Sequence, residues 1–64
     1  MITGTVKVWH SSDGWGFIEG IDGEDYYLHA SKVRLGQSIS TNCRVKFDVS
    51  QGYNGPEAEN VTLY

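Results

Sequence analysis

Two large aromatic side chains, Trp15 and Phe17, alternate with smaller residues in the run Gly14-Trp15-Gly16-Phe17-Ile18-Glu19. Successive side chains of an extended strand point to opposite faces, so Trp15 and Phe17 share one face. The glutamate that ends the run falls on the same face and keeps it in contact with water. A flat, solvated aromatic face of this kind is suited to stacking against nucleic-acid bases.

A second run, Tyr26-Tyr27-Leu28-His29, repeats this alternation and places Tyr27 and His29 on one face. We expect Tyr27 to extend the surface that the first run begins. A histidine by itself is more often an ordinary surface or capping residue than a ligand contact. The position of His29, two residues after Tyr27, favours a contact with bases.

The elements that must position these residues are short strands separated by turns. Alternation and β-branched residues predict strands over 3–9, 15–19, 24–29, 44–49 and 58–63. Asp22-Gly23 is a strong hairpin signal between two of them. Residues 30–33 are long enough only for a single 3₁₀ turn, and residues 34–42 read as a loop anchored by Ile39.

Five short strands without a helix predict an all-β fold, a five-stranded antiparallel barrel of the OB type. The side chains expected inside the barrel are apolar and alternate along the strands: Val6, Ile18, Tyr26 or Leu28, Val33, Ile39, Val45, Phe47, Val49, Val61 and Leu63. This set fills a core without Trp15, Phe17 or Tyr27. The three rings are therefore not needed to fill the core, as expected of residues on a binding face.

The chain has 64 residues, 39% of them hydrophobic, which predicts one small domain over residues 1–64. No segment approaches the roughly 20 apolar residues of a membrane span, and the start does not resemble a signal peptide. The single cysteine, Cys43, cannot form an internal disulfide. We therefore expect a cytoplasmic protein.

Charge sets a limit on how the chain binds its partner. Five Lys and Arg residues stand against eight Asp and Glu residues, giving a formal net charge of −3. Tight binding to nucleic acid usually depends on neutralising phosphates with Lys and Arg. We therefore expect binding dominated by stacking, weak to moderate in affinity and only mildly sensitive to salt.

In these motifs and their order, the chain resembles the cold-shock domain family, in particular the small bacterial type. The two aromatic runs are similar to the first and second ribonucleoprotein motifs of that family. The opening Gly4-Thr5-Val6-Lys7 and the closing segment 55–62 match the ends of the family pattern. The RNA-recognition motif shares the aromatic signature but needs two packed helices, for which this chain has no room.

The resemblance implies a partner and a set of contact residues. The partner is single-stranded RNA or DNA, rich in pyrimidines and bound with little sequence preference, and the activity is RNA-chaperone-like. The implied contacts are Lys7, Trp9, His10, Trp15, Phe17, Asp25, Tyr27 and His29, with Tyr53 adding a further ring. Two of these have plainer alternatives, because Lys7 also fits a solvated strand lysine and Asp25 a hairpin cap.

The chain departs from the family pattern at several contact positions. Asp13 stands where a lysine is usual, and Val8-Trp9-His10 replaces Trp-Phe-Asn, so that one aromatic is missing. Ala30 replaces a further aromatic after the histidine, and the loop over 34–42 is short and lacks its phenylalanine. These changes affect the expected affinity more than the expected fold.

Other functions have less support in the residues. No Ser/His/Asp or Cys/His set converges, so we expect no enzyme, and no cofactor is implied. His10 and His29 lack a Cys or carboxylate spacing that would complete a metal site. The serious alternative is a protein-interaction module that uses the same aromatic face for a peptide or for a second copy of the chain. We expect a monomer or a weak homodimer.

Overall fold

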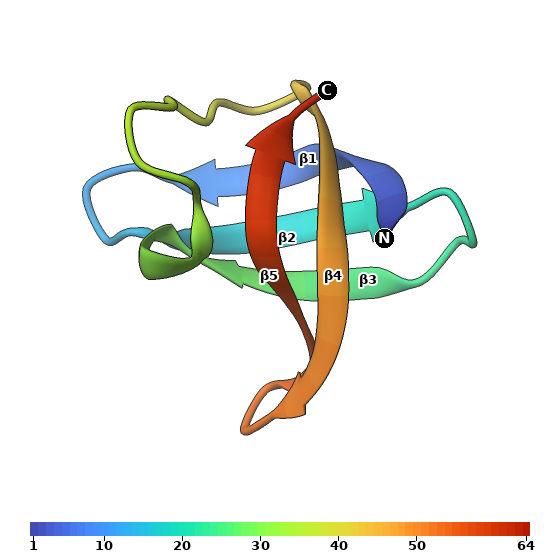
Figure 1. Ribbon diagram of the computed structural model, residues 1–64. Coiled ribbons are helices and arrows are strands. Elements are labelled where there is room, and N and C mark those ends of the chain that lie inside the picture. Colours follow the sequence, from blue (N-terminus) through green and yellow to red (C-terminus); the bar gives the residue numbers. More distant parts are fainter.

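The computed structural model describes residues 1–64 as a closed β-barrel. Its strands are β1 (Ile2–His10), β2 (Trp15–Gly20), β3 (Asp25–His29), β4 (Arg44–Gly52) and β5 (Gly55–Leu63). A single 3₁₀ turn, η1 (Ala30–Lys32), follows β3. The strands close in the order β1-β2-β3-β5-β4, and β4 and β5 cross the sheet of β1–β3 (Figure 1). The predicted all-β barrel is confirmed.

The barrel closes through one parallel pair, although antiparallel pairing was expected throughout. Strands β3 and β5 meet in parallel at Tyr27 and Glu57, and a second parallel bridge joins Val33 to Val61. The remaining strand pairs are antiparallel. Two strands far apart in sequence seal the barrel here, and their relative direction does not follow from the short turns that fix the hairpins.

The core consists of eight buried apolar side chains, and both Tyr26 and Leu28 belong to it. Its members are Val6, Ile18, Tyr26, Leu28, Val45, Phe47, Ala58 and Val61. Val33 and Ile39, from the segment after β3, pack against this cluster while staying partly exposed. In β3 and β4 the core residues are two apart, as the period of two requires.

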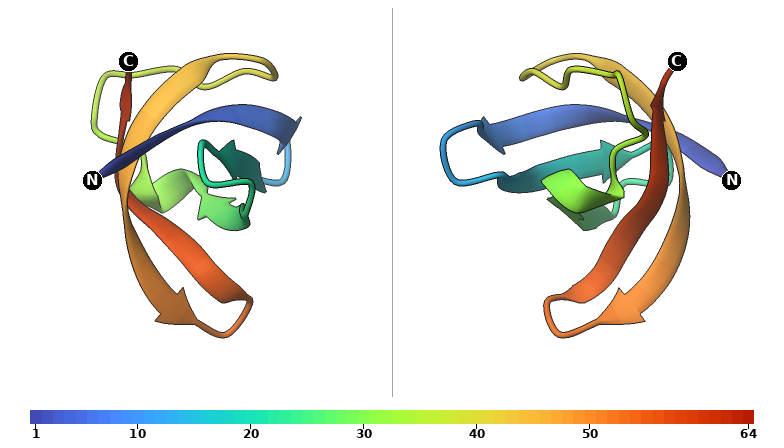
Figure 2. Two further views of the ribbon diagram at one scale, coloured as in Figure 1. Left: turned by 90° about the vertical axis from the view of Figure 1, so that its right-hand side faces the viewer. Right: turned by 60° about the vertical axis from the view of Figure 1, so that its left-hand side comes forward.

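Val49 and Leu63 were expected inside the barrel, and this is wrong. Val49 lies opposite Ala58 in the β4–β5 hairpin, which extends past β3 (Figures 1 and 2), and Val49 is 43% exposed. Leu63, the last residue of β5, is 41% exposed. A register shift between β4 and β5, with Asn60 at a φ of 53°, instead brings Ala58 and Val61 both into the core. A bulge of this kind inverts the alternation downstream of it.

Candidate nucleic-acid interface

Three aromatic rings lie side by side on the outer face of β2 and β3. The ring centroids of Trp15 and Phe17 are 6.0 Å apart, those of Trp15 and Tyr27 are 6.3 Å apart, and those of Phe17 and Tyr27 are 5.9 Å apart. These separations are typical of contacting aromatic pairs. We call these three residues the ring cluster.

Strand register explains why the three rings meet. Phe17 lies opposite Tyr27 in the antiparallel pair of β2 and β3, and Trp15 lies opposite His29. The residues between the rings, Gly16 and Ile18, are buried on the inner face. Each ring of the cluster is half-buried and so stays partly open to solvent.

The ring cluster lines one side of a shallow hollow of about 330 Å³. The fourth lining residue is Asn54, from the turn between β4 and β5. The backbone N–H of Asn54 donates to the Glu57 carboxylate, with 3.3 Å between the nitrogen and Oε2, which ties the turn to its own strand. Neither the aromatic pattern nor the charge pattern of the sequence identified Asn54 as a site residue. Asn54 comes close to the ring cluster only because the β4–β5 hairpin is long enough to extend there.

A bulge at Lys7 decides which first-strand side chains join this face. Val6 lies opposite Ile18, but Val8 lies opposite Phe17, so Lys7 is an extra residue in β1. Because of this insertion, Val8 moves to the side of the ring cluster and Trp9 moves to the inner side, opposite the buried Gly16. The sequence pattern did not identify Val8 as a residue of this face.

The expected contact between Trp9 and bases is therefore not supported by its position. Trp9 packs against the hydrophobic core and is half-buried. Its indole covers Gly16 so closely that a Cβ at residue 16 would come within 2.9 Å of it. The family resemblance implied a base contact for Trp9, and the bulge at Lys7, which places Trp9 on the inner side, was not foreseen.

The two histidines lie at the Trp15 end of the cluster. The His10 ring centroid is 4.4 Å from that of Trp15, and the two planes are tilted by 46°. His29 is exposed, and its Nδ1 accepts the backbone N–H of Ser31 at 3.1 Å, which caps η1. This capping bond leaves the opposite ring nitrogen, Nε2, directed away from the cap and able to meet a ligand.

The remaining expected contacts are more scattered. Lys7 and Asp25 form an ion pair at the Phe17 end, with Nζ 3.0 Å from Oδ1 and 3.2 Å from Oδ2. The hydrogen bond to Asp25 raises the pKa of Lys7 above its usual value, and Glu19 adds to the effect. Tyr53 is fully exposed next to Asn54 and makes no ring contact with the cluster.

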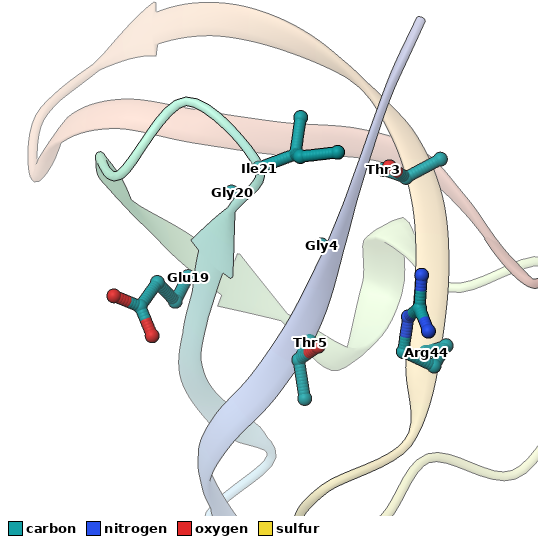
Figure 3. Close-up of a pocket in the computed structure, with 7 residues that line it drawn as sticks. All are labelled: Thr3, Gly4, Thr5, Glu19, Gly20, Ile21 and Arg44. Carbon is teal, nitrogen blue, oxygen red and sulfur yellow. The ribbon is translucent and has the colours of Figure 1, made fainter.

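A second hollow, of about 190 Å³, lies between β1, β2 and β4 (Figure 3). Thr3 and Thr5 contribute hydroxyl groups, and Glu19 and Arg44 flank β1 on either side. Ile21 is its one hydrophobic lining residue. This hollow has no ring on which a base can stack and carries charges of both signs, so the ring cluster is the better candidate site.

Comparison with known proteins identifies the family of this chain. A family model described as the "'Cold-shock' DNA-binding domain" matches residues 2–64. The chain belongs to the cold-shock domain family. This is a family of nucleic-acid-binding domains. The membership of this chain confirms the resemblance that the two aromatic runs indicated.

Curated relatives match over nearly their whole length. The cold shock-like protein CspLB of Listeria monocytogenes is 42% identical over 65 residues, covering 97% of each chain. The cold shock protein of Arthrobacter globiformis is 39% identical, covering 98% of each. The cold shock protein CspC of Bacillus subtilis is 40% identical, covering 95% of this chain and 96% of its own.

A solved structure shows the same fold at lower sequence similarity. The Drosophila Unr CSD456 structure superposes with a TM-score of 0.82 at 22% identity. The match covers 98% of this chain and 26% of the Unr chain. The barrel is thus a fold shared with one part of a longer protein.

Two further properties of the structure bear on possible functions. No three of the His, Cys, Asp and Glu side chains gather closely enough to hold a metal ion. The chain has no helix that is long and apolar enough to cross a membrane.

Proposed function

We propose that this chain binds single-stranded RNA or DNA with low sequence preference, by stacking bases on Trp15, Phe17 and Tyr27. The observation that carries this proposal is the contact of three rings from neighbouring strands on a solvated face. Every base has a π-face, so stacking tolerates many sequences. We expect pyrimidine-rich strands to bind best, as the family resemblance implies.

The affinity expected from this surface is modest. Stacking contributes roughly 1–3 kcal/mol per base, so three rings supply about 3–6 kcal/mol before the cost of ordering the strand. Stacking alone therefore gives a dissociation constant no tighter than tens of micromolar. Weak, sequence-tolerant binding suits an RNA chaperone, because the strand is held unpaired briefly and then released to pair again.

The test removes the ring cluster without disturbing the core. In the double variant with Trp15→Ala and Phe17→Ala, we expect oligo-T and oligo-U to lose measurable binding while the chain remains folded by circular dichroism. The matched control is Tyr64→Ala, which removes an exposed ring that lies 5.7 Å from the guanidinium of Arg44 instead. The control should bind as the unaltered chain does.

The same variants distinguish the alternative of a protein-interaction surface. If the unaltered chain self-associates and the double variant is a monomer, while oligonucleotide binding is absent from both, the ring cluster is a protein interface. Sedimentation velocity measures the first property, and fluorescence anisotropy of labelled oligonucleotides measures the second.

A further inference from the structure

The sheet that carries the ring cluster contains very little positive charge. Lys7 is the only Lys or Arg in β1, β2 and β3, and the carboxylates of these strands belong to Glu19 and Asp25. One cation against two carboxylates leaves these strands with a formal charge of −1 when the histidines are neutral. Within these three strands, a bound nucleic acid therefore meets a single cationic side chain.

The single cation is already engaged within the protein. Lys7 is in β1 and Asp25 is in β3, so their side chains bridge across β2, the strand that carries Trp15 and Phe17. Both carboxylate oxygens of Asp25 lie within 3.2 Å of the ammonium nitrogen. Glu19 is close enough to stabilise the ammonium charge as well. A phosphate that approaches this ammonium group meets the negative charge of the Asp25 carboxylate, which already accepts from the Lys7 N–H donors.

We infer that Asp25 is an intramolecular competitor for phosphate, whose carboxylate occupies the ammonium group of Lys7 and so limits both the affinity for charged strands and its dependence on salt. This inference rests on the proposed function of the ring cluster. It assigns Asp25 a role opposite to that of a base contact, because removing its charge should strengthen binding.

The size of the effect follows from the exposure of the pair. The side chains of Lys7 and Asp25 are 43% and 52% exposed, so water screens their attraction. The attraction within an exposed ion pair of this kind changes an equilibrium constant by about two- to fivefold. Phosphate can therefore displace Asp25, but only with a loss of affinity of that order. Each phosphate newly neutralised adds about 0.7 to the slope of log affinity against log salt for a single strand.

The experiment compares a charged with an uncharged backbone. Binding of phosphodiester oligo-T and of methylphosphonate oligo-T, which lacks backbone charge, is measured at about 20 mM and about 200 mM salt. Asp25→Asn should tighten binding of the phosphodiester about two- to fivefold at low salt and steepen its salt slope by about 0.7. Binding of the methylphosphonate should not change.

Two controls separate competition at Lys7 from a general change of charge. Asp48→Asn removes an exposed carboxylate that lies 3.8 Å from the terminal ammonium group, away from the ring cluster, and should have no effect. In a Lys7→Gln background, Asp25→Asn should no longer tighten binding. A gain that persists without Lys7, or one that Asp48→Asn reproduces, overturns the inference.

The remaining outcomes are equally decisive. If Asp25→Asn weakens binding of both oligomers, Asp25 accepts hydrogen bonds from bases and the inference is wrong. If it changes neither oligomer, Lys7 is not available to phosphate and the inference is also wrong. Failure of the unaltered chain to bind either oligomer refutes the proposed function itself, which is a separate result.

Discussion

Replacing Val8 by Trp should tighten binding of single strands, because the bulge at Lys7 places residue 8 beside the ring cluster. Val8 is half-buried and lies opposite Phe17 in the β1–β2 pair. Directly opposed residues of an antiparallel pair have Cβ atoms about 4.5–5.5 Å apart, so the new indole can pack against Phe17. The ring cluster would then extend over a third strand.

The expected gain is one additional stacking surface less the cost of ordering the new side chain. Stacking contributes roughly 1–3 kcal/mol, and immobilising a side chain costs about 0.5–1.5 kcal/mol. The net gain is about 1 kcal/mol, which is roughly a fivefold decrease in dissociation constant. Fluorescence anisotropy of a labelled oligo-U measures this directly and does not depend on the added tryptophan's own emission.

The control for Val8→Trp is Val49→Trp. Val49 is also a valine on a strand, but it belongs to β4, is exposed and does not line the hollow beside the ring cluster. We expect the same affinity for this variant as for the unaltered chain. An unchanged or weakened affinity in a folded Val8→Trp variant would show that residue 8 does not face the bound strand, and would refute the placement derived from the bulge.

Further predictions concern the elements that hold the ring cluster in place. Gly16→Ala should destabilise the fold by at least about 3 kcal/mol, since its Cβ would lie 2.0 Å from the Val8 carbonyl oxygen. Gly23→Ala, whose Cβ meets nothing within 4 Å but whose φ is 85°, should cost only about 1 kcal/mol in chemical denaturation. Comparable losses in the two variants would contradict this account of residue 16. In a separate test, the Tyr26 hydroxyl donates to Asp22 at 2.6 Å, which lowers the pKa of Asp22 and raises the pKa of Tyr26 to about 12. The hydrogen bond to Asp22 therefore stabilises the fold fully at pH values above the ordinary pKa of an aspartate. This contribution is lost as the pH falls through the lowered pKa of Asp22. In an NMR titration, Tyr26→Phe should raise the pKa of Asp22, and an unmoved carboxyl titration would exclude the hydrogen bond as its cause.

Local alternation predicted the part of the site that lies on uninterrupted strands. Trp15 and Phe17 share a face because β2 is regular from end to end, and Tyr27 joins them because the turn at Gly23 fixes the register of β3. These relations depend only on the period of two and on a short hairpin. Both can be deduced from neighbouring residues.

Bulges and long-range contacts account for what the sequence did not predict. The extra residue at Lys7 exchanged the faces of Val8 and Trp9, and nothing in that segment distinguishes a bulged strand from a regular one. The approach of Asn54 to the ring cluster depends on how far the β4–β5 hairpin extends beyond β3. Such features are set by the closure of the whole barrel.

The most direct test of the central claim is an NMR titration of the two indole N–H signals with oligo-T. Trp15 belongs to the ring cluster, whereas Trp9 packs against the core, so the chain contains both a probe and an internal reference. We predict a saturable shift of the Trp15 signal, with a much smaller shift for Trp9. Signals that stay in place up to millimolar oligonucleotide, or a shift of Trp9 that exceeds that of Trp15, would contradict stacking on this face.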